Sequence, residues 1–486
     1  MKRTFLFYDI ETTGLNKAFD QVLQFAAIRT DEELNEIERH EFLVRLNPDI
    51  VPSPQAIIVH GLSIDDLYRG QSEAEAIEKI HGLMNTPGTL SLGYNTLGFD
   101  DEFLRFSFYR NLLPPYNHQY ANQCGRMDIY PIATLYYLFH NESIRWPLIN
   151  DIPSLKLEHI NAANHFAQGA AHDAMVDVHA TLELARRFKA ETEMWQYAMG
   201  YFDKETDLAR MGKLPVAFTI AQQSFREGIM TDGIFGAQQY YQSYVIALGR
   251  HNHYKNQTLW LRLDHEDFSA LTLEGLLEQT WVINKKPGET GLLLPITERF
   301  TRYIDATRHE RIKQNRQFLI DHPDLMLELA RHHRDYTHPK IPNLDESAAL
   351  YQNGFLLPHE IQLCAEFHQR DINGKIALLE DFHNPCLQAL AIRYIGRLHP
   401  EKLPAQHQQT YGEYLACVNP AKLEEALLDY RRKPRLTPQG ALMEINTLQT
   451  DSALTEGQQQ LLVGLKNYLG AQFNLLITDD ASSGTQ

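Results

Sequence analysis

The sequence predicts three consecutive units: a mixed α/β sheet domain, a small β-rich domain and an all-helical domain. Short apolar runs alternate with amphipathic segments over residues 1–190, which is typical of an α/β sheet. Strand-like pieces separated by Gly and Asn turns follow within residues 196–345, which also carry a helical extension. Helical patterns broken by Pro and Gly dominate residues 348–475, and the polar residues 476–486 are expected to be disordered.

The predicted strands share a short apolar run that is bounded by turn residues. In the first unit they cover residues 4–11, 22–31, 40–46 and 88–95, and in the second unit residues 214–220, 258–264 and 280–296. Residues 72–84 and 172–191 have the periodicity of amphipathic helices. In the second of these helices, Val176, Leu182 and Leu184 are available for the buried side.

The composition is that of an ordinary globular protein, with 486 residues, 43% hydrophobic and 22% charged. No basic segment leads into an apolar one and no uninterrupted apolar run approaches the roughly 18 residues of a membrane span. We therefore expect a cytoplasmic protein without a membrane partner. The cysteines lie far apart without a C-x-x-C pair, which argues against a zinc ribbon or disulfide framework and predicts buried small side chains. They are Cys124, Cys364, Cys386 and Cys417.

Two acids separated by one residue, Asp9 and Glu11, end the first apolar run. Residues i and i+2 of a strand point to the same face, so the two carboxylates project together. The simpler explanation is an exposed strand end, where acids are common. The alternative is a divalent-metal site, because Mg²⁺ prefers carboxylate oxygens that converge from one side. That hypothesis requires further carboxylates downstream.

Two later segments place acids at predicted helix starts. Asp100 and Asp101 follow one apolar run, and His172, Asp173 and Asp177 surround the start of another helix. Helix capping would explain Asp100, Asp101 or Asp173 taken singly. The conjunction is different, because D-x-E, N…F-D and H-x-x-x-x-D occur in one order within residues 9–177.

This order resembles the DEDDh family of 3′ to 5′ exonucleases, and the run "DIETTGL" at residues 9–15 is similar to the first motif of that family. The segments "GYNTLGFDDEFLR", "FYRNLLPPYN", "PSLKLEHI" and "AHDAMVDVHAT" narrow the resemblance to the bacterial exonuclease I family. Asn95 lies five residues before Asp100, one more than in most DEDDh enzymes. The resemblance implies an RNase H-like exonuclease domain, an SH3-like β-rich domain and an α-helical C-terminal domain.

The resemblance also implies roles for the acids and for His172. Asp9 would bridge two Mg²⁺ ions, for which Mn²⁺ is expected to substitute. Glu11 and Asp177 would complete the ion on the side of the nucleophile, and Asp100 would serve the other, largely through water. Two such ions about 3.5 to 4 Å apart can activate the water and stabilise the leaving 3′ oxygen. His172 would take the proton from the water, whereas packing in a loop is its alternative role.

Two residues beside the first motif are implied to bind substrate. Thr12 would hold the terminal nucleotide through its backbone, and Leu15 would be an apolar wedge against the last base. A core position is the alternative for Leu15. Asp173 is assigned to helix capping, and Asp101 to a supporting role at most.

The formal net charge of −17 is unfavourable for a protein that holds nucleic acid, because phosphates are neutralised by Lys and Arg. The best basic patch lies between residues 299 and 316, with a net charge of +4. Its cations are Arg299, Arg302, Arg308, Arg311, Lys313 and Arg316. The patch either guides DNA or binds the acidic tail of single-strand-binding protein, the partner implied by the resemblance. A solvated helix face is the alternative.

The sequence therefore predicts a Mg²⁺-dependent exonuclease that digests single-stranded DNA from the 3′ end to 5′ mononucleotides. It would serve DNA repair or recombination and act as a monomer. A DEDDh enzyme acting on RNA or short oligonucleotides is the nearest alternative, and the long chain beyond residue 190 argues against it. A non-catalytic single-strand binding module is the alternative from another class, and the filled catalytic positions argue against that.

Overall fold

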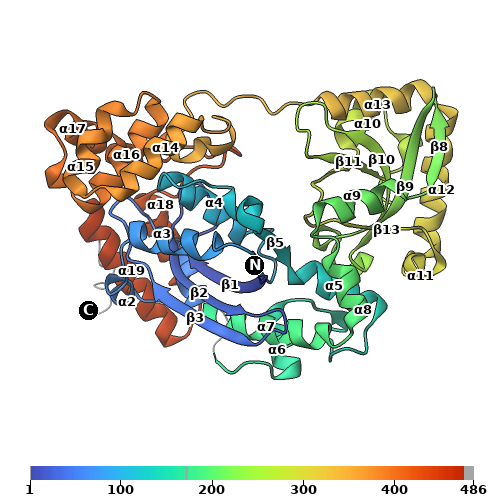
Figure 1. Cartoon of the computed structure of the whole chain (residues 1–486), viewed down its shortest axis with the longest axis horizontal. Helices are drawn as coiled ribbons and strands as arrows, with labels where there is room; N and C mark the ends of the chain where they lie inside the picture. Colours follow the sequence, from blue (N-terminus) through green and yellow to red (C-terminus); the bar gives the residue numbers. More distant parts are fainter. Residues whose placement is uncertain (1, 170–172, 476–486) are drawn as a thin grey trace, which may run out of the picture.

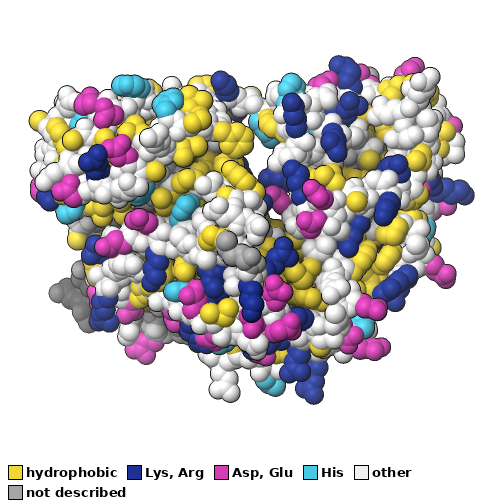
Figure 2. Space-filling model, in the orientation of Figure 1, with side chains coloured by type: hydrophobic (Ala, Val, Ile, Leu, Met, Phe, Trp, Pro, Cys, Tyr) yellow, Lys and Arg dark blue, Asp and Glu magenta, His cyan; other side chains and the backbone are white. Residues whose placement is uncertain are grey.

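The computed structural model describes residues 2–169 and 173–475, which fold into three units (Figure 1). A five-stranded sheet with its helices lies at the bottom of the view, and a six-stranded sheet and an all-helical unit stand above it on opposite sides. A segment without helix or strand, residues 336–345, runs between the two upper units. The surface is hollowed between these two units (Figure 2). The three kinds of unit thus occur in the predicted order.

The first sheet is mixed, as predicted. It contains β1 (Thr4–Thr12), β2 (Val22–Thr30), β3 (Glu36–Leu43), β4 (Thr89–Gly93) and β5 (Gly125–Asp128). The strand order is β3-β2-β1-β4-β5. The pairs β1–β2 and β2–β3 are antiparallel, and the pairs β1–β4 and β4–β5 are parallel. β1 is therefore central and has hydrogen-bonded partners on both edges.

The helices of this unit pack on both faces of the sheet. They are α1 (Pro54–His60), α2 (Ile64–Tyr68), α3 (Glu73–Met84), α4 (Asp100–Arg110), α5 (Ile129–Phe139), α6 (Leu157–Asn164) and α7 (Ala174–Lys189). Phe5 and Phe7 share a buried core with residues of α5 and α7, whereas Leu6 and Ile10 share another with residues of α3 and α4. The alternation along β1 thus assigns odd-numbered residues to the face that α7 covers.

The second unit is built on an antiparallel sheet of six strands. These are β8 (Val216–Ile220), β9 (Gln223–Thr231), β10 (Gln242–Arg250), β11 (Thr258–Arg262), β12 (Val282–Lys285) and β13 (Leu292–Leu294). The order is β12-β11-β10-β9-β13, and β8 pairs with β9. Its helices are α8 (Thr192–Met199), α9 (Lys204–Gly212), α10 (Leu273–Gln279), α11 (Glu298–Thr301), α12 (Ala306–Asp321) and α13 (Pro323–Asp335).

The third unit is helical and shares a core with the first. Its helices are α14 (Pro358–Gln369), α15 (Ile372–Ala377), α16 (Pro385–Leu398), α17 (Ala405–Val418), α18 (Pro438–Leu448) and α19 (Glu456–Phe473). Phe367 and Leu465 belong to the same buried cluster as Phe19, Ile57 and Phe106 of the first unit. Burial of these apolar side chains, at about 25 cal/mol per Å² of surface, holds the helical unit on the sheet domain.

Several expectations from the sequence differ from the structure. The third strand begins at Glu36 and ends at Leu43, because Val44 forms only an isolated bridge with Gln71. Val176 is half-buried and lines a surface cavity, so it does not belong to the buried side of α7. The prediction of buried cysteines is confirmed for Cys124 and Cys364, whereas Cys386 is half-buried and Cys417, near the end of α17, is exposed. The predicted tail, residues 476–486, lies outside the described residues.

Candidate metal centre and active site

β1 carries Asp9 and Glu11 near its carboxyl end, where they still pair with β2. Both are odd-numbered, like Phe5 and Phe7, so their carboxylates point to the face covered by α7. Parallel pairing with β4 ends at Phe7, so both acids lie beyond the last pair with β4. Functional residues collect at the carboxyl ends of parallel strands because the connecting loops open there.

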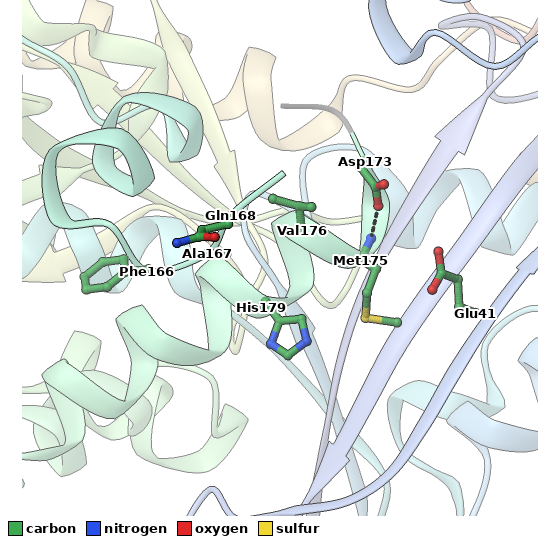
Figure 3. Close-up of a pocket in the computed structure, with 8 residues that line it drawn as sticks. All are labelled: Glu41, Phe166, Ala167, Gln168, Asp173, Met175, Val176 and His179. Atoms are coloured by element: carbon green, nitrogen blue, oxygen red, sulfur yellow. Dashed lines mark hydrogen bonds between the residues drawn. The ribbon is translucent and has the colours of Figure 1, made fainter. Parts of the chain in front are cut away.

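Asp177 reaches the same place from α7. The helix begins with Asp173 as N-cap, whose carboxylate accepts a hydrogen bond from the backbone N–H of Met175 at 3.0 Å (Figure 3). The assignment of Asp173 to capping is therefore confirmed. Asp177 follows one turn later on a helix that crosses β1 and β2. Ligand oxygens of Asp9, Glu11 and Asp177 all lie within 4.8 Å of one another.

Asp100 is the fourth acid, at the first position of α4. It is buried, with 6% of its surface exposed, and its charge is the strongest electrostatic neighbour of Asp9. Burial raises the pKa of Asp100 to about 8, and the nearby charge of Asp128 adds to the effect. α4 thus brings Asp100 to the carboxylates of β1 and α7.

The four acids repel one another. Burial, together with the charges of Asp100 and Asp177, raises the pKa of Asp9 well above its ordinary value. Burial and the charge of Asp177 raise the pKa of Glu11 to about 8. Crowded carboxylates of this kind offer the hard oxygen ligands that divalent cations prefer, and a bound cation would remove the repulsion. The donor set therefore fits a divalent metal.

Asp101 has a different environment from its neighbour Asp100. Its carboxylate is buried and pairs with His118 at 2.9 Å, Arg126 at 2.6 Å and Arg105 at 3.2 Å. Burial raises its pKa, but the charges of Arg126 and Arg105 outweigh that effect and hold the pKa well below its usual range. These contacts anchor the first turn of α4, so Asp101 supports the position of Asp100.

The loop after β1 carries the predicted substrate residues. The Thr12 hydroxyl donates to the carbonyl of Gly14 at 2.8 Å, and Leu15 at the tip is 84% exposed. The alternative that Leu15 is a core residue is therefore wrong. Asp20 shapes the loop by accepting the N–H of Asn16 at 2.7 Å. Leu15 is thus an apolar side chain exposed to solvent, four residues after Glu11.

His172, the predicted general base, lies outside the described residues. The nearest described residues on its C-terminal side are Asp173 and the first turn of α7. Figure 3 shows the adjoining cavity, in which His179 and Val176 of α7 face Phe166 and Gln168.

A groove of about 1020 Å³ joins the metal centre to the β-rich unit. Asp177 lines it together with Tyr94 and Tyr130 of the first unit and Tyr241 of the second. No sequence motif marks these tyrosines as a group, because only the fold brings their three segments together. A signal for Tyr94 was present, since it directly precedes Asn95 in the motif that ends at Asp100.

The basic residues between 299 and 316 are largely used within the protein. Arg308 pairs with Asp264 and is 13% exposed, and its Nη2 also donates to the carbonyl of Gln242 at 2.5 Å. The other contacts are Arg311 with Asp267 and Arg316 with Glu227, each at 2.5 Å, and Arg302 with the carbonyl of Leu138. Arg299 lies over the Phe300 ring at 5.7 Å. Lys313 is exposed on α12.

The chain is similar in sequence and fold to known exonucleases. Residues 6–185 match the RNase_T exonuclease family model. Exodeoxyribonuclease I of Escherichia coli K12 is 29% identical over 437 residues, which cover 85% of this chain and 89% of that protein. Two solved structures, a zinc-bound E. coli exonuclease I–single-stranded DNA complex and an SSB/exonuclease I structure with an inhibitor, have TM-scores of 0.84 and 0.82. Each is 26% identical and covers 97% of this chain and 100% of its own.

The sheet, the carboxylate cluster and the family match define residues 6–185 as a domain of the exonuclease family. The chain is an enzyme of this class, with the predicted RNase H-like, β-rich and helical parts. Over most of its length it is a homologue of exodeoxyribonuclease I. Within residues 2–169 and 173–475, no helix combines the length and hydrophobicity that a bilayer crossing requires.

Proposed function

We propose that the protein hydrolyses single-stranded DNA from its 3′ end and releases 5′ mononucleotides. The observation that carries this proposal is the convergence of Asp9, Glu11 and Asp177 within 4.8 Å. Asp177 also lines a groove between the exonuclease domain and the β-rich unit. A metal centre beside a groove of this size suits a flexible strand. The homology to exodeoxyribonuclease I supports the substrate class.

The cofactor in this proposal is Mg²⁺, as two ions, with Mn²⁺ as a substitute. Asp9, Glu11, Asp177 and Asp100 would hold the ions. When bound, such ions lower the pKa of a water and offset negative charge on the phosphate. Phosphodiester hydrolysis needs mainly positioning and charge stabilisation, and the four carboxylates meet the first need because β1, α4 and α7 hold them in place.

The protein's own side chains orient the strand. The backbone of Thr12 binds the terminal nucleotide, and the exposed Leu15 packs against its base. Asp128 accepts the N–H groups of Asn95 at 2.8 Å and Leu97 at 3.0 Å, which fixes the loop between β4 and α4 at the groove. His172 accepts the proton of the attacking water.

We further infer that the protein works as a monomer, in the cytoplasm, and binds the acidic tail of single-strand-binding protein. The SSB/exonuclease I structure supports the last point, since its fold is shared over 97% of this chain. Repair and recombination are the processes in which free 3′ strands arise.

A digestion assay tests the function. Matched DNA and RNA oligonucleotides, single and double stranded, are incubated with Mg²⁺ or EDTA, and products are resolved by length. The proposal requires a ladder that shortens from the 3′ end only with single-stranded DNA and only with metal. Preferred RNA cleavage would favour the nearest alternative, and binding without cleavage would favour the non-catalytic module.

A further inference from the structure

A second cavity, of about 500 Å³, lies in the β-rich unit apart from the carboxylates. Its walls are unusually rich in rings, which are His251, Tyr254, His332, His333, Tyr336 and His338. Leu259, Leu277 and Val282 add an apolar floor. The last turn of α13 and the segment that leads to the helical unit form one side, so the cavity lies toward the hollow between the upper units (Figures 1 and 2).

The ring wall is built before any ligand arrives. His251 is buried, and its Nδ1 accepts the N–H groups of His253 at 3.1 Å and Tyr254 at 3.2 Å, which fixes the turn after β10. The N–H of His338 donates to the Tyr254 hydroxyl at 3.1 Å. The Tyr254 and His338 rings are 5.8 Å apart, and His338 and Tyr336 are 5.3 Å apart. Two distant segments thus form one continuous aromatic surface.

Polar and partly exposed side chains also line the cavity. Nε2 of His333 is shielded from solvent and has no hydrogen-bond partner in the described structure. Burial lowers the pKa of His333 to about 4, so its imidazole is neutral at pH 7. Tyr336 is 48% exposed, and His338 is exposed as well. A ligand could therefore stack on the rings, with Asn284 and Thr280 as polar groups of the lining.

The cavity and the active-site groove are neighbours that meet at β12. Asn284 lines both of them. Ile283 lies on the groove side and Val282 on the cavity side, so one strand of the sheet forms the boundary between them. A chain molecule that leaves the groove along β12 reaches the ring wall next.

We propose that this cavity is a nucleobase subsite for the part of the single strand that lies upstream of the 3′ end being cleaved. The inference rests on the proposed function and extends it to a second site. Aromatic faces stack on any base, so such a site holds DNA without sequence preference. Asn284 would meet the polar edge of the base.

A metal ion is the other occupant that a histidine-rich cavity suggests. Among the described residues, however, three or more ligand atoms of His, Cys, Asp or Glu converge within 4.8 Å only at Asp9, Glu11 and Asp177. The rings of the cavity are instead arranged edge to face or tilted in sequence, as in a stacking surface. The observations therefore favour a base.

The test compares the wild type with the double variant Tyr254→Leu/His338→Leu in the full chain. Leucine keeps apolar volume but removes the ring, and both side chains lie at the surface or partly so. Affinity for fluorescent oligodeoxythymidines of increasing length is measured by anisotropy in EDTA. We expect about tenfold weaker binding of strands long enough to reach the cavity, the loss typical of one stacked base. The matched variant Tyr254→Phe/His338→Phe should restore the affinity.

Abasic strands separate base stacking from backbone contact. In the wild type, one abasic position upstream of the 3′ end should weaken binding. The leucine variant has already lost the rings, so it should bind the intact strand and the abasic strand equally well. Hydrolysis of a trinucleotide, which is too short for the cavity, should be equal in both proteins. Equal affinities at all lengths, or no abasic effect, would overturn the subsite. So would Zn²⁺ binding that requires His338 while DNA affinity is unchanged. A wild type that binds through the rings but does not hydrolyse the trinucleotide would instead reject the proposed function.

Discussion

Arg397 of α16 holds the carboxylate of Asp49 with two hydrogen bonds, from Nε to Oδ1 at 3.0 Å and from Nη2 to Oδ2 at 2.7 Å. Asp49 lies between β3 and α1, so the pair joins the exonuclease domain to the helical unit. The Tyr414 hydroxyl donates a third bond at 2.6 Å. All three side chains are buried within the apolar cluster that the two units share, where an unpaired charge would be costly.

We expect Asp49→Asn to destabilise the contact between the two units by about 3 kcal/mol, because it leaves the buried Arg397 charge with only its longer ion pair to Glu73, at 3.8 Å. Thermal unfolding and limited proteolysis at pH 7 measure the effect. Asp65→Asn on the neighbouring helix α2 is the matched control, since Asp65 is exposed and should change the unfolding temperature little. Equal unfolding temperatures for both variants would contradict the prediction.

The same pair predicts an acid sensitivity. Burial raises the pKa of Asp49, but the charge and hydrogen bonds of Arg397 outweigh burial and hold the pKa well below its ordinary value. A carboxyl with a depressed folded-state pKa contributes stability that is fully present above its unfolded pKa, near 4, and is lost as the pH falls below it. The difference in unfolding temperature between wild type and Asp49→Asn should therefore shrink between about pH 5 and pH 3.

Asp9→Ala should abolish hydrolysis and leave the fold intact, because it removes a central ligand and relieves like-charge crowding. In EDTA its unfolding temperature should equal or exceed that of the wild type, while Mg²⁺ should no longer raise it. Glu183→Gln, on α7 outside the cluster, is the control and should keep both activity and metal stabilisation. Cleavage above a few per cent of wild type would reject the metal assignment.

Metal binding should release protons near neutral pH. The pKa values of Glu11 and Asp100 are about 8 in the metal-free protein, so these carboxyls are partly protonated at pH 7. A cation binds their deprotonated forms, and the apparent affinity should therefore rise with pH up to about 8 and then level off. Calorimetry in two buffers of different ionisation enthalpy counts the protons, and a pH-independent affinity would contradict this protonation.

His172→Ala should lower turnover by about 10²-fold or more, the usual effect of losing a general base. Affinity for single-stranded DNA in EDTA should change little. His179→Ala on α7 is the matched control, because His179 lines the neighbouring cavity and is not assigned to the chemistry. If the two variants have equal rates, His172 serves packing only.

The sequence predicted the acids better than their surroundings. Asp9 and Glu11 could be placed on one face because strand alternation is a local rule, and Asp173 as a cap because it precedes a helix. The groove tyrosines Tyr130 and Tyr241 could not be found in this way. They lie on different units, and no local pattern encodes the packing of one unit on another.

The basic patch shows a limit of counting charges along the sequence. Counting charges between residues 299 and 316 gave a net of +4, but a count ignores partners that are distant in sequence. Asp264, which follows β11, and Glu227 of β9 pair with Arg308 and Arg316 of α12. The rings of the cavity in the β-rich unit were missed for the same reason, since they come from segments about 80 residues apart.

The contacts of Arg308 therefore separate two roles within the patch. Arg308→Ala should lower the free energy of unfolding by about 1 to 3 kcal/mol, because Asp264 loses one of its two arginine partners in a buried site. Lys313→Glu should leave stability unchanged, as expected for an exposed side chain.

If the patch binds DNA or the acidic tail of single-strand-binding protein, Lys313→Glu should slow digestion of long or protein-coated strands and reduce the salt dependence of the rate. A short bare oligonucleotide should be digested normally. Unfolding temperatures and a salt series with both substrates measure these effects. Equal rates for wild type and Lys313→Glu on every substrate would leave α12 with a solvated face and its arginines with a structural role.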